Sequence, residues 1–216
     1  IRREGGAIDP CPPRSRIADS GLLEGRELIW LADPFAAYIA HVQGSARIRL
    51  QDGTVVTVGY AGCNGHPYRS VARELVARGH IAEEELSLAA MIDWFRAHPD
   101  RVGPLTDLNP RYIFFRFEEG PPRGCLNEPV TPLRTIATDK SIFPRGALAL
   151  VAADLPRRRA GRVAFAPALR LALDQDRGGA IQAPGRCDLY MGTGREAGIL
   201  AGRTLQEGRL YFLFPR

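Results

Sequence analysis

The chain of 216 residues is long enough for one large domain or two small ones, and its 45% hydrophobic and 25% charged residues are typical of a folded globular protein. No apolar run approaches the roughly 20 residues of a membrane helix, and no signal-peptide pattern is present. The net charge of +5 suits an anionic partner. Neither zinc-finger spacing nor an RNP-like aromatic strand occurs, so we expect no nucleic acid partner.

The first half of the chain alternates between helical and strand-like patterns. Asp33 followed by Pro34 predicts the start of a helix, and Gly44 predicts its end. Alternating runs on both sides of Asp52-Gly53 are a strong hairpin signal. The expected elements are a loop at 1–13, a strand at 28–32, a helix at 33–43, hairpin strands at 46–50 and 54–60, helices at 68–78 and 87–98, and a strand at 112–117.

The helix expected at 87–98 has the clearest apolar face in the chain. Leu88, Met91, Ile92 and Phe95 recur at i, i+3, i+4 and i+7, which is the period of one helical face. A face of this kind packs in a core far more often than it binds a cofactor. We therefore expect these four side chains in the core.

The Gly/Pro-rich segment 119–124 is the clearest break in composition, and a domain boundary is expected there. The sequence thus predicts a mixed α/β domain at residues 1–120 and a mostly β domain at 121–216. Short strands between Gly/Pro turns favour a small barrel for the second domain. Its expected elements are strands at 134–138, 147–153, 162–166, 170–175 and 210–214, a solvated hairpin tip at 157–159, and a helix at 196–203.

Cysteine and histidine spacing argues against a metal site. No Cys-x-x-Cys pair occurs among the four cysteines, and no histidine has metal-ligand spacing to another. We expect mostly buried free thiols, with a Cys125–Cys187 disulfide as the alternative, and neither a metal nor an organic cofactor.

Two acidic residues near the C-terminus, Asp176 and Asp188, each lie where a strand-like run meets glycine-rich chain. Taken alone, an aspartate in that position is usually a turn former. Glycine in the same segments also allows a sharp turn and the close approach of a ligand.

The longer segments around these aspartates carry a resemblance to a known family. The segment 176–181 (Asp-Arg-Gly-Gly-Ala-Ile), the following Asp188-Leu189-Tyr190, and the segment 192–198 resemble the catalytic segment of the MltA family of lytic murein transglycosylases. Segments 41–45, 59–68 and 109–115 resemble the same family in the same order. The similarity extends over most of the chain, from about Arg14 to Arg216.

The resemblance implies a fold that is mainly β with an α/β insert. Residues 121–216 would form a double-psi β-barrel with three characteristic aspartates (a 3D domain), and residues 1–120 would form the mixed α/β domain, with a groove between them. The family also has a Tyr-rich strand before the region matched by residues 1–13, and this sequence contains no counterpart of it.

The resemblance also implies a reaction. The family cleaves the β-1,4 bond between N-acetylmuramic acid and N-acetylglucosamine in peptidoglycan and forms a 1,6-anhydro product. Its single catalytic acid falls on Asp188, a supporting carboxylate on Asp176, and the third aspartate on Asp139. Two alternatives remain open: a wall-binding module that does not cut, and a hydrolase that uses two carboxylates and water.

The resemblance further implies residues that bind the sugar chain, and the amides, hydroxyls and aromatic rings among them are groups that usually hold sugars. These candidates are Gln43, Gly44, Ser45, Tyr60, Asn64, Gly65, Tyr68, Arg69, Asp139, Gly178, Gly179, Ala180 and Tyr190. Without the resemblance, Gln43-Gly44 would be interpreted as a helix stop and Asn64-Gly65 as a turn. The family further implies peptidoglycan strands as partners, a monomer with other cell-wall enzymes as candidate partners, and the periplasmic face of the bacterial outer membrane as the location. This chain itself carries no recognisable anchor or export signal.

Overall fold

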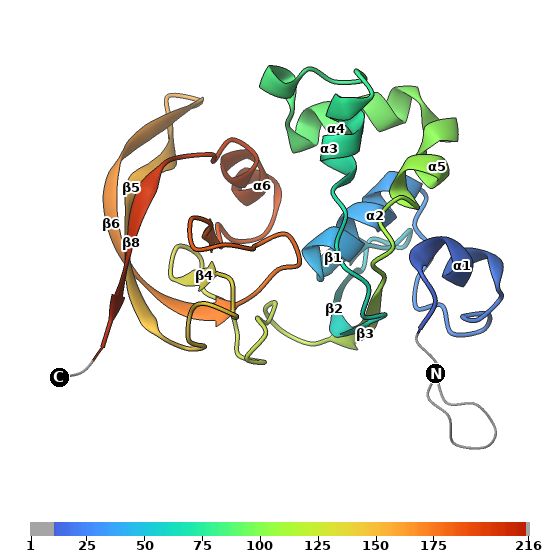
Figure 1. The fold of residues 1–216 in the computed structure, drawn as a ribbon, viewed down its shortest axis with the longest axis horizontal. Coiled ribbons are helices and arrows are strands. Elements are labelled where there is room, and N and C mark those ends of the chain that lie inside the picture. The colour runs from blue at the N-terminus through green and yellow to red at the C-terminus, as the bar shows by residue number, and fades with distance from the viewer. Residues whose placement is uncertain (1–10, 215–216) are drawn as a thin grey trace. The chain divides into compact units, whose positions relative to one another are not determined.

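The computed structural model describes residues 11–214, and the chain divides into two compact units, Ile1–Gly120 and Pro121–Arg216 (Figure 1). The loop expected at 1–13 falls mostly outside the described residues. None of the helices in the described part is long and apolar enough to cross a membrane.

The first unit contains a small antiparallel sheet, in the order β1-β2-β3, together with several short helices. The predicted hairpin is confirmed, since β1 pairs with β2 from Ala46↔Val58 to Arg49↔Val55. The described elements are α1 (Arg14–Asp19), α2 (Pro34–Gln43), β1 (Ala46–Arg49), β2 (Val55–Cys63), α3 (Val71–Ala77), η1 (Glu83–Glu85), α4 (Leu88–Ala97), η2 (Pro99–Arg101), α5 (Val102–Thr106) and β3 (Ile113–Glu118).

Helix α2 begins and ends where its sequence predicts. The Asp33 carboxylate accepts hydrogen bonds from the backbone N–H groups of Phe35 (2.8 Å) and Ala36 (3.1 Å). Gly44 ends the helix in the left-handed conformation (φ 77°), where a residue with a Cβ would be strained. Helices α3 and α4 begin in a similar way, with Ser70 and Ser87 as capping residues.

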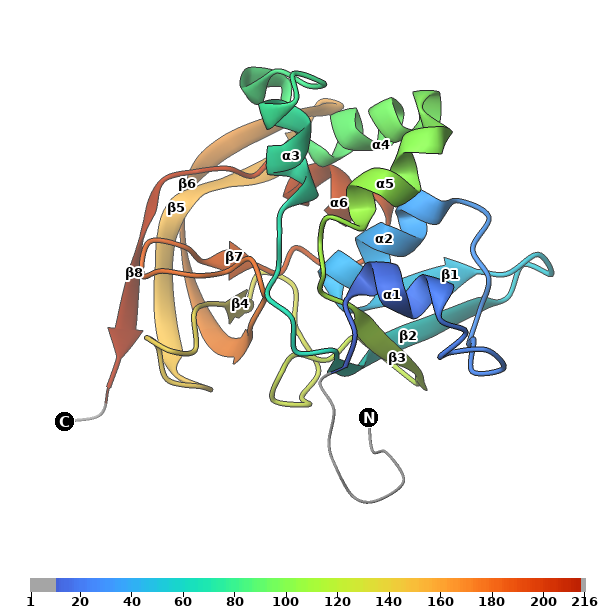
Figure 2. The ribbon, with the colours of Figure 1, turned by 45° about the vertical axis from the view of Figure 1, so that its right-hand side comes forward.

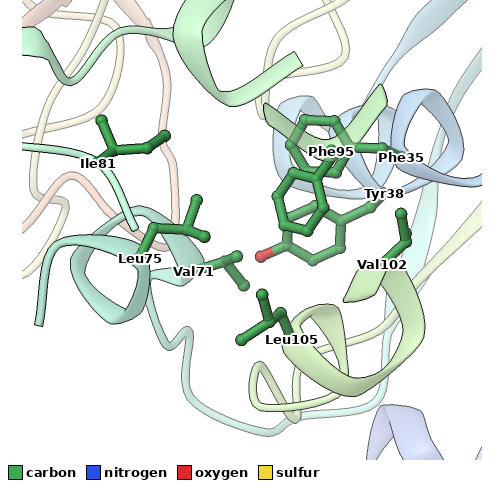
Figure 3. Close-up of a cluster of buried hydrophobic side chains, with 8 residues drawn as sticks. All are labelled: Phe35, Tyr38, Val71, Leu75, Ile81, Phe95, Val102 and Leu105. Atoms are coloured by element: carbon green, nitrogen blue, oxygen red, sulfur yellow. The ribbon is translucent and has the colours of Figure 1, made fainter. Parts of the chain in front are cut away.

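The core of the first unit lies between α2, α3, α4 and α5 (Figure 3). The rings of Phe35 and Phe95 stack with their centroids 4.0 Å apart. The predicted core face of α4 is right for Phe95, which is fully buried, and for the half-buried Met91 and Ile92 that pack against the cluster. It is wrong for Leu88, which is 42% exposed because it lies in the first turn, outside the packed part of the helix.

The strand predicted at residues 28–32 is not formed. This segment has no strand partner, and Trp30 within it is 83% exposed. An apolar run predicts a strand only if another strand is available to bond its backbone, and β1, β2 and β3 pair with one another instead. The sequence reading also missed the short helices α1 and α5.

The second unit is built on one mixed sheet in the order β7-β4-β6-β5-β8 (Figure 2). Strands β4 and β6 are parallel, and the other neighbours are antiparallel. The elements are β4 (Thr135–Ala137), β5 (Leu148–Arg159), β6 (Arg162–Asp176), β7 (Asp188–Leu189), α6 (Arg195–Ala201) and β8 (Gly208–Leu213).

The two strands predicted at 162–166 and 170–175 are one long strand, β6, which forms a hairpin with β5. Pro167 lies between the two predicted segments. Position 167 bonds on the side of β6 away from β5, and β4 pairs on that side only with the C-terminal end of β6, so no neighbouring strand needs the missing N–H at Pro167. The turn is Ala160-Gly161, both with positive φ. Residues 157–159, expected at a solvated hairpin tip, are exposed as predicted, but they are the last residues of β5 and directly precede the turn.

The two faces of this sheet differ in burial. Ile136, Ala149 and Ala172 form the buried cluster of the unit. On the other face, register aligns Leu173 of β6 with Leu148 of β5 and Leu213 of β8, and all three are exposed. The sheet therefore has one packed face and one apolar face that is open in the described chain.

All four cysteines are free and half-buried, so the alternative of a Cys125–Cys187 disulfide is wrong, and the thiols are less buried than expected. The backbone N–H of Cys125 donates a hydrogen bond to the side chain of Asp176 at the end of β6, whereas Cys187 directly precedes β7. Because β4 lies between β6 and β7 in the sheet, it separates the two cysteines.

Candidate active site

The short strand β4 brings the two candidate carboxylates into one row of the sheet. Ala137 is paired with Asp176 of β6 on one side and with Asp188 of β7 on the other. A shift in register after Ile136 puts Asp176, rather than Gln175, opposite Ala137. Two strand spacings put the backbones of the aspartates about 10 Å apart, with only the small Ala137 between them.

Asp176 is the more buried of the two aspartates. Its carboxylate accepts a hydrogen bond from the backbone N–H of Cys125 at 3.0 Å. Burial raises the pKa of Asp176, while hydrogen bonds from the N–H groups of Arg177 and Cys125 and the charge of Lys140 act in the opposite direction. This carboxyl group therefore holds its proton more strongly than an ordinary aspartate.

Asp188 is about half exposed and faces solvent. Arg186, two residues earlier, donates from Nε to Asp188 Oδ1 at 3.1 Å and from Nη2 to Oδ2 at 3.4 Å. Because residues i and i+2 of an extended chain lie on the same side, the guanidinium and the carboxylate meet directly. The carboxylate of Asp188 is thus accessible to a ligand, and its charged neighbour, the exposed guanidinium of Arg186, could move away from it.

Asp139 ties two loops together. One of its oxygens accepts hydrogen bonds from the backbone N–H (2.9 Å) and the hydroxyl (2.7 Å) of Ser141, and the other accepts from the N–H of Ala183 (2.9 Å). The bonds from Ser141, followed by that from Ala183, lower the pKa of Asp139. Asp139 stays ionised and anchors the loop that leads to Asp188.

The sequence reading missed a buried ion pair next to these aspartates. Lys140 is paired with Asp174, and both side chains are almost fully buried. The ammonium group of Lys140 also donates to Thr138 Oγ1 at 2.9 Å, and Thr138 Oγ1 donates to Asp174 Oδ2 at 2.6 Å. An aspartate directly after the apolar run 171–173 was the available signal, because a carboxylate is rarely buried without a partner.

The two cysteines near the aspartates are poor nucleophiles. Burial, then the charges of Asp188 and Asp174, raises the pKa of Cys187 to about 12. Burial and the charge of Asp176 also raise the pKa of Cys125. Both thiols remain protonated near neutral pH, and the reactive thiolate form is not available.

The glycine-rich loop between Asp176 and Asp188 is held by packing and by backbone bonds. A Cβ on Gly178 would lie 2.9 Å from Cδ1 of the buried Ile181, so a larger residue does not fit there without movement. Gly179 and Ala180 follow in an exposed turn. After Asp188, the N–H of Tyr190 donates to Thr135 O (2.9 Å), and its carbonyl accepts from Leu133 N (2.7 Å).

In the first unit, Asn64 is fully occupied by the protein itself. Its amide group donates to Pro12 O (3.0 Å) and Pro110 O (2.8 Å), and its carbonyl oxygen accepts from Tyr112 N (2.8 Å) and His66 N (3.4 Å). These bonds favour a role in shaping the loop. The adjacent Gly65 has a positive φ of 80°, as a turn after Asn64 requires.

The other candidates of the first unit differ in how accessible they are. Gln43 and Tyr60 are exposed, at the end of α2 and on β2 respectively, whereas Ser45 and Tyr68 are half-buried. The exposed Arg69 binds the Glu74 carboxylate through Nε (3.0 Å) and Nη2 (2.6 Å).

His41 is a half-buried structural residue. Its Nδ1 accepts the backbone N–H of Ile113 at 3.2 Å, and its ring packs against Tyr112 and Phe115. Burial, followed by the nearby charge of Arg14, lowers the pKa of His41 to about 3. Across residues 11–214, no group of three or more His, Cys, Asp or Glu side chains is arranged to hold a metal ion.

Comparison with protein families assigns both units. Residues 1–116, more than half of the chain, match the model of the MltA specific insert domain, and residues 134–214 match the model of the 3D domain. The chain belongs to the MltA family. The recognition made from the sequence motifs is therefore confirmed.

Curated relatives of this MltA-family chain share about a third of its residues. The membrane-bound lytic murein transglycosylase A of Vibrio cholerae is 35% identical over 208 residues, which is 94% of this chain and 56% of the relative. The protein of the same name from Escherichia coli K12 is 33% identical over 205 residues, again 94% of this chain and 56% of the relative. The chain spans little more than half the length of these relatives.

Solved structures of MltA-family proteins have the same fold. A membrane-bound lytic murein transglycosylase from Agrobacterium tumefaciens superposes with a TM-score of 0.87 at 34% identity, covering 99% of this chain and 59% of the other. The E. coli MltA structure with bound chitohexaose superposes with a TM-score of 0.79 at 30% identity, covering 98% and 64%.

The MltA-family models divide the candidate residues into two groups. Asp139, Asp176, Asp188 and the glycine-rich loop lie within the 3D match, whereas Gln43, Tyr60, Asn64 and Arg69 lie within the match to the insert domain. The described structure brings the first group together around β4. The second group is spread along the first unit from α2 to the loop before α3.

Proposed function

We propose that this MltA-family chain cleaves the β-1,4 bond between N-acetylmuramic acid and N-acetylglucosamine in peptidoglycan and acts as a lytic transglycosylase. The observation that carries the proposal is the row Asp176–Ala137–Asp188, in which an accessible carboxylate shares one strand neighbour with a more buried one. The names of the relatives support the same reaction class.

Asp188 is the proposed acid and base. Its carboxylic acid form donates a proton to the glycosidic oxygen as the bond from C1 breaks. The C6 hydroxyl of the same muramyl residue then attacks C1, and its proton passes to the Asp188 carboxylate. The proton balance closes without water, and the products are a 1,6-anhydromuramyl end and a new N-acetylglucosamine end.

An internal nucleophile explains why one carboxylate can suffice. The C6 hydroxyl belongs to the residue that is cleaved, so its effective concentration at C1 is far above that of a separate molecule. Asp176 has the supporting role. It shares the Ala137 row with Asp188, and above its own raised pKa its negative charge would favour the protonated form of Asp188.

The proposal includes a fold for each domain and the residues that would bind the sugar chain. We assign residues 121–216 to a double-psi β-barrel catalytic domain and residues 1–120 to the MltA-specific α/β domain. In the barrel domain, the residues proposed to contact the glycan are Gly178, Gly179 and Ala180 of the glycine-rich loop, together with Tyr190 and Asp139. In the α/β domain, the proposed contacts are Gln43, Gly44, Ser45, Tyr60, Tyr68 and Arg69. Asn64 and Gly65 would shape the loop that carries Tyr68 and Arg69.

The partner and location are proposals as well. An E. coli MltA structure contains bound chitohexaose, which supports a glycan strand as the ligand of this chain. The relatives are named membrane-bound, which supports an envelope location. We assign the periplasmic face of the outer membrane and a monomer, with other cell-wall enzymes as candidate partners.

Mass spectrometry of the products from purified peptidoglycan tests the reaction. Anhydro-muropeptides are expected. Reducing ends would instead identify a hydrolase that uses Asp176 and Asp188 with water, and no product would identify a binding module. A substrate without the C6 hydroxyl should bind and remain uncut, because the internal nucleophile is missing.

A further inference from the structure

The ion pair between Arg186 and Asp188 conflicts with the role of Asp188 as an acid. Both oxygens of the carboxylate face the guanidinium, at 3.1 Å and 3.4 Å. A neighbouring cation favours the charged form of a carboxyl group, whereas a general acid must carry a proton when the substrate is bound. Something must therefore separate the pair before the bond is cleaved.

The surroundings of Asp188 identify Arg186 as the cation that matters. Asp176 lies across Ala137 and is negative or neutral, and the thiol of Cys187 is protonated. The ammonium group of Lys140 is paired with Asp174 and faces Thr138. Within residues 11–214, Arg186 is the cation that forms an ion pair with Asp188.

The pair can exchange partners at little cost. The side chain of Arg186 is 52% exposed and that of Asp188 is 48% exposed, so solvent already screens their attraction. The loop before Arg186 is fixed by the bond from Ala183 to Asp139, which leaves the long arginine side chain as the part that moves. A guanidinium binds carboxylates through two parallel hydrogen bonds, so a second carboxylate can replace Asp188.

We propose that Arg186 binds a carboxylate on the C3 substituent of the muramyl residue and thereby releases Asp188 to take up the proton that cleavage needs. This inference rests on the proposed function and deepens it. The ligand is a carboxylate-bearing glycan, and the carboxylate comes either from the peptide stem or from the lactyl group of a strand without peptide. Neutral glycans contain neither group and would leave the pair closed.

The binding half of the proposal is tested without turnover. In an Asp188→Asn background, Arg186→Gln is compared with Arg186 for binding of intact strands, amidase-treated strands and chitohexaose. We expect binding of a carboxylate-bearing strand to weaken by about ten-fold, the loss typical of one charge-assisted contact, and chitohexaose binding to stay unchanged. A loss confined to intact strands identifies the peptide carboxylate, and a loss confined to amidase-treated strands identifies the lactyl group.

The coupling half is tested by pH profiles of cleavage. The profile of kcat/KM reports the free enzyme, and that of kcat reports the complex. With a carboxylate-bearing strand, we expect activity in kcat to persist to higher pH than activity in kcat/KM, because the guanidinium has left Asp188 in the complex. In Arg186→Gln, the kcat/KM profile should extend to higher pH and coincide with the kcat profile.

Arg158 provides a matched control. It pairs with Glu196 at 2.6 Å in the same unit, and the two side chains are 48% and 53% exposed. Arg158→Gln should leave binding and both profiles as in the wild type. Equal losses for chitohexaose, or Arg186→Gln profiles that match those of Arg158→Gln, would overturn the proposal. If the wild type releases no product, the proposed function fails, and the binding comparison still decides whether Arg186 recognises a carboxylate.

Discussion

Asp188 and Asp176 share a row of the sheet but differ in their surroundings. Asp188 is accessible and has a charged partner that can leave, whereas Asp176 is partly desolvated and bonded to the backbone of Cys125. Two carboxyl groups in unlike environments are suited to different roles in one reaction.

Asp188→Asn should abolish cleavage and leave the fold intact. The amide keeps the shape of the side chain but has no transferable proton, so the rate should fall by about 10²–10⁴-fold. Product release measured by mass spectrometry checks the rate, and circular dichroism checks the fold. Asp154→Asn, on the exposed part of β5, is the control and should retain activity. A rate above a few per cent of wild type would remove Asp188 from the acid role.

Asp176→Asn should reduce the rate less than Asp188→Asn and narrow the pH range of activity. Where Asp176 is ionised, its charge favours the proton on Asp188, so its removal should let Asp188 lose that proton at lower pH. The alkaline limb of kcat/KM should therefore move to lower pH. Since the two groups would titrate together, the limb describes the pair. An unchanged profile would show that they do not interact.

His41 should make the first unit sensitive to acid. Its pKa is about 3 when folded and would return to about 6.5 on unfolding. The unfolded state thus binds the extra proton between these values, so stability is full above pH 6.5 and falls as the pH decreases toward 3. Hydrogen exchange should show residues 11–120 opening in that window. His41→Gln, which keeps an acceptor for Ile113, should flatten the dependence, and equal acid sensitivity in both proteins would contradict this explanation.

At the scale of elements, strands β4 and β6 are held together by a buried ion pair as well as by apolar contacts. Lys140 follows β4, and Asp174 lies in β6 opposite Ile136. The pair therefore fixes the strand that carries Asp176 against the strand that carries Ala137.

Lys140→Met should destabilise the second unit strongly. It would leave the carboxylate of Asp174 buried without its cation, a change that typically costs about 3–5 kcal/mol. The double variant Lys140→Met/Asp174→Leu should recover much of this loss, because no buried charge remains. Urea unfolding measures both variants. If the single variant were as stable as the wild type, the pair would not be a structural element.

The two faces of the sheet in the second unit should respond differently to truncation. Ile136 is fully buried against Ala149 and Ala172, so Ile136→Ala should cost about 2–5 kcal/mol. Leu171 lies on the exposed face, and Leu171→Ala should cost less than about 1 kcal/mol. The same urea titration compares the two variants. A large loss at Leu171 would mean that this face is covered in solution.

At the scale of the whole molecule, the chain divides into two compact units, each with its own buried cluster. The first unit is organised around the aromatic contact of Phe35 with Phe95 (Figure 3), and the second around Ile136 in the centre of its sheet. The relatives are considerably longer than this chain.

The sequence by itself determined those features that depend on residues close together in the chain. The ends of α2, the β1–β2 hairpin and the helical face ending at Phe95 depend on neighbouring residues, so a capping aspartate, an Asp-Gly turn and a 3.6-residue period were sufficient to predict them. The motif order was likewise sufficient to identify the family. The candidate aspartates came from that resemblance, since each alone reads as a turn residue.

Contacts between distant segments were decided only by the tertiary structure. The apolar run at 28–32 has no partner strand. Strand β6 continues through Pro167 because no neighbouring strand requires a hydrogen bond from that position. A separation of twelve positions could not reveal that Asp176 and Asp188 flank Ala137, because a parallel pairing and a register shift create that row. The Lys140–Asp174 pair depends on the same pairing, since 34 positions separate its members and only the sheet brings their charges together out of water.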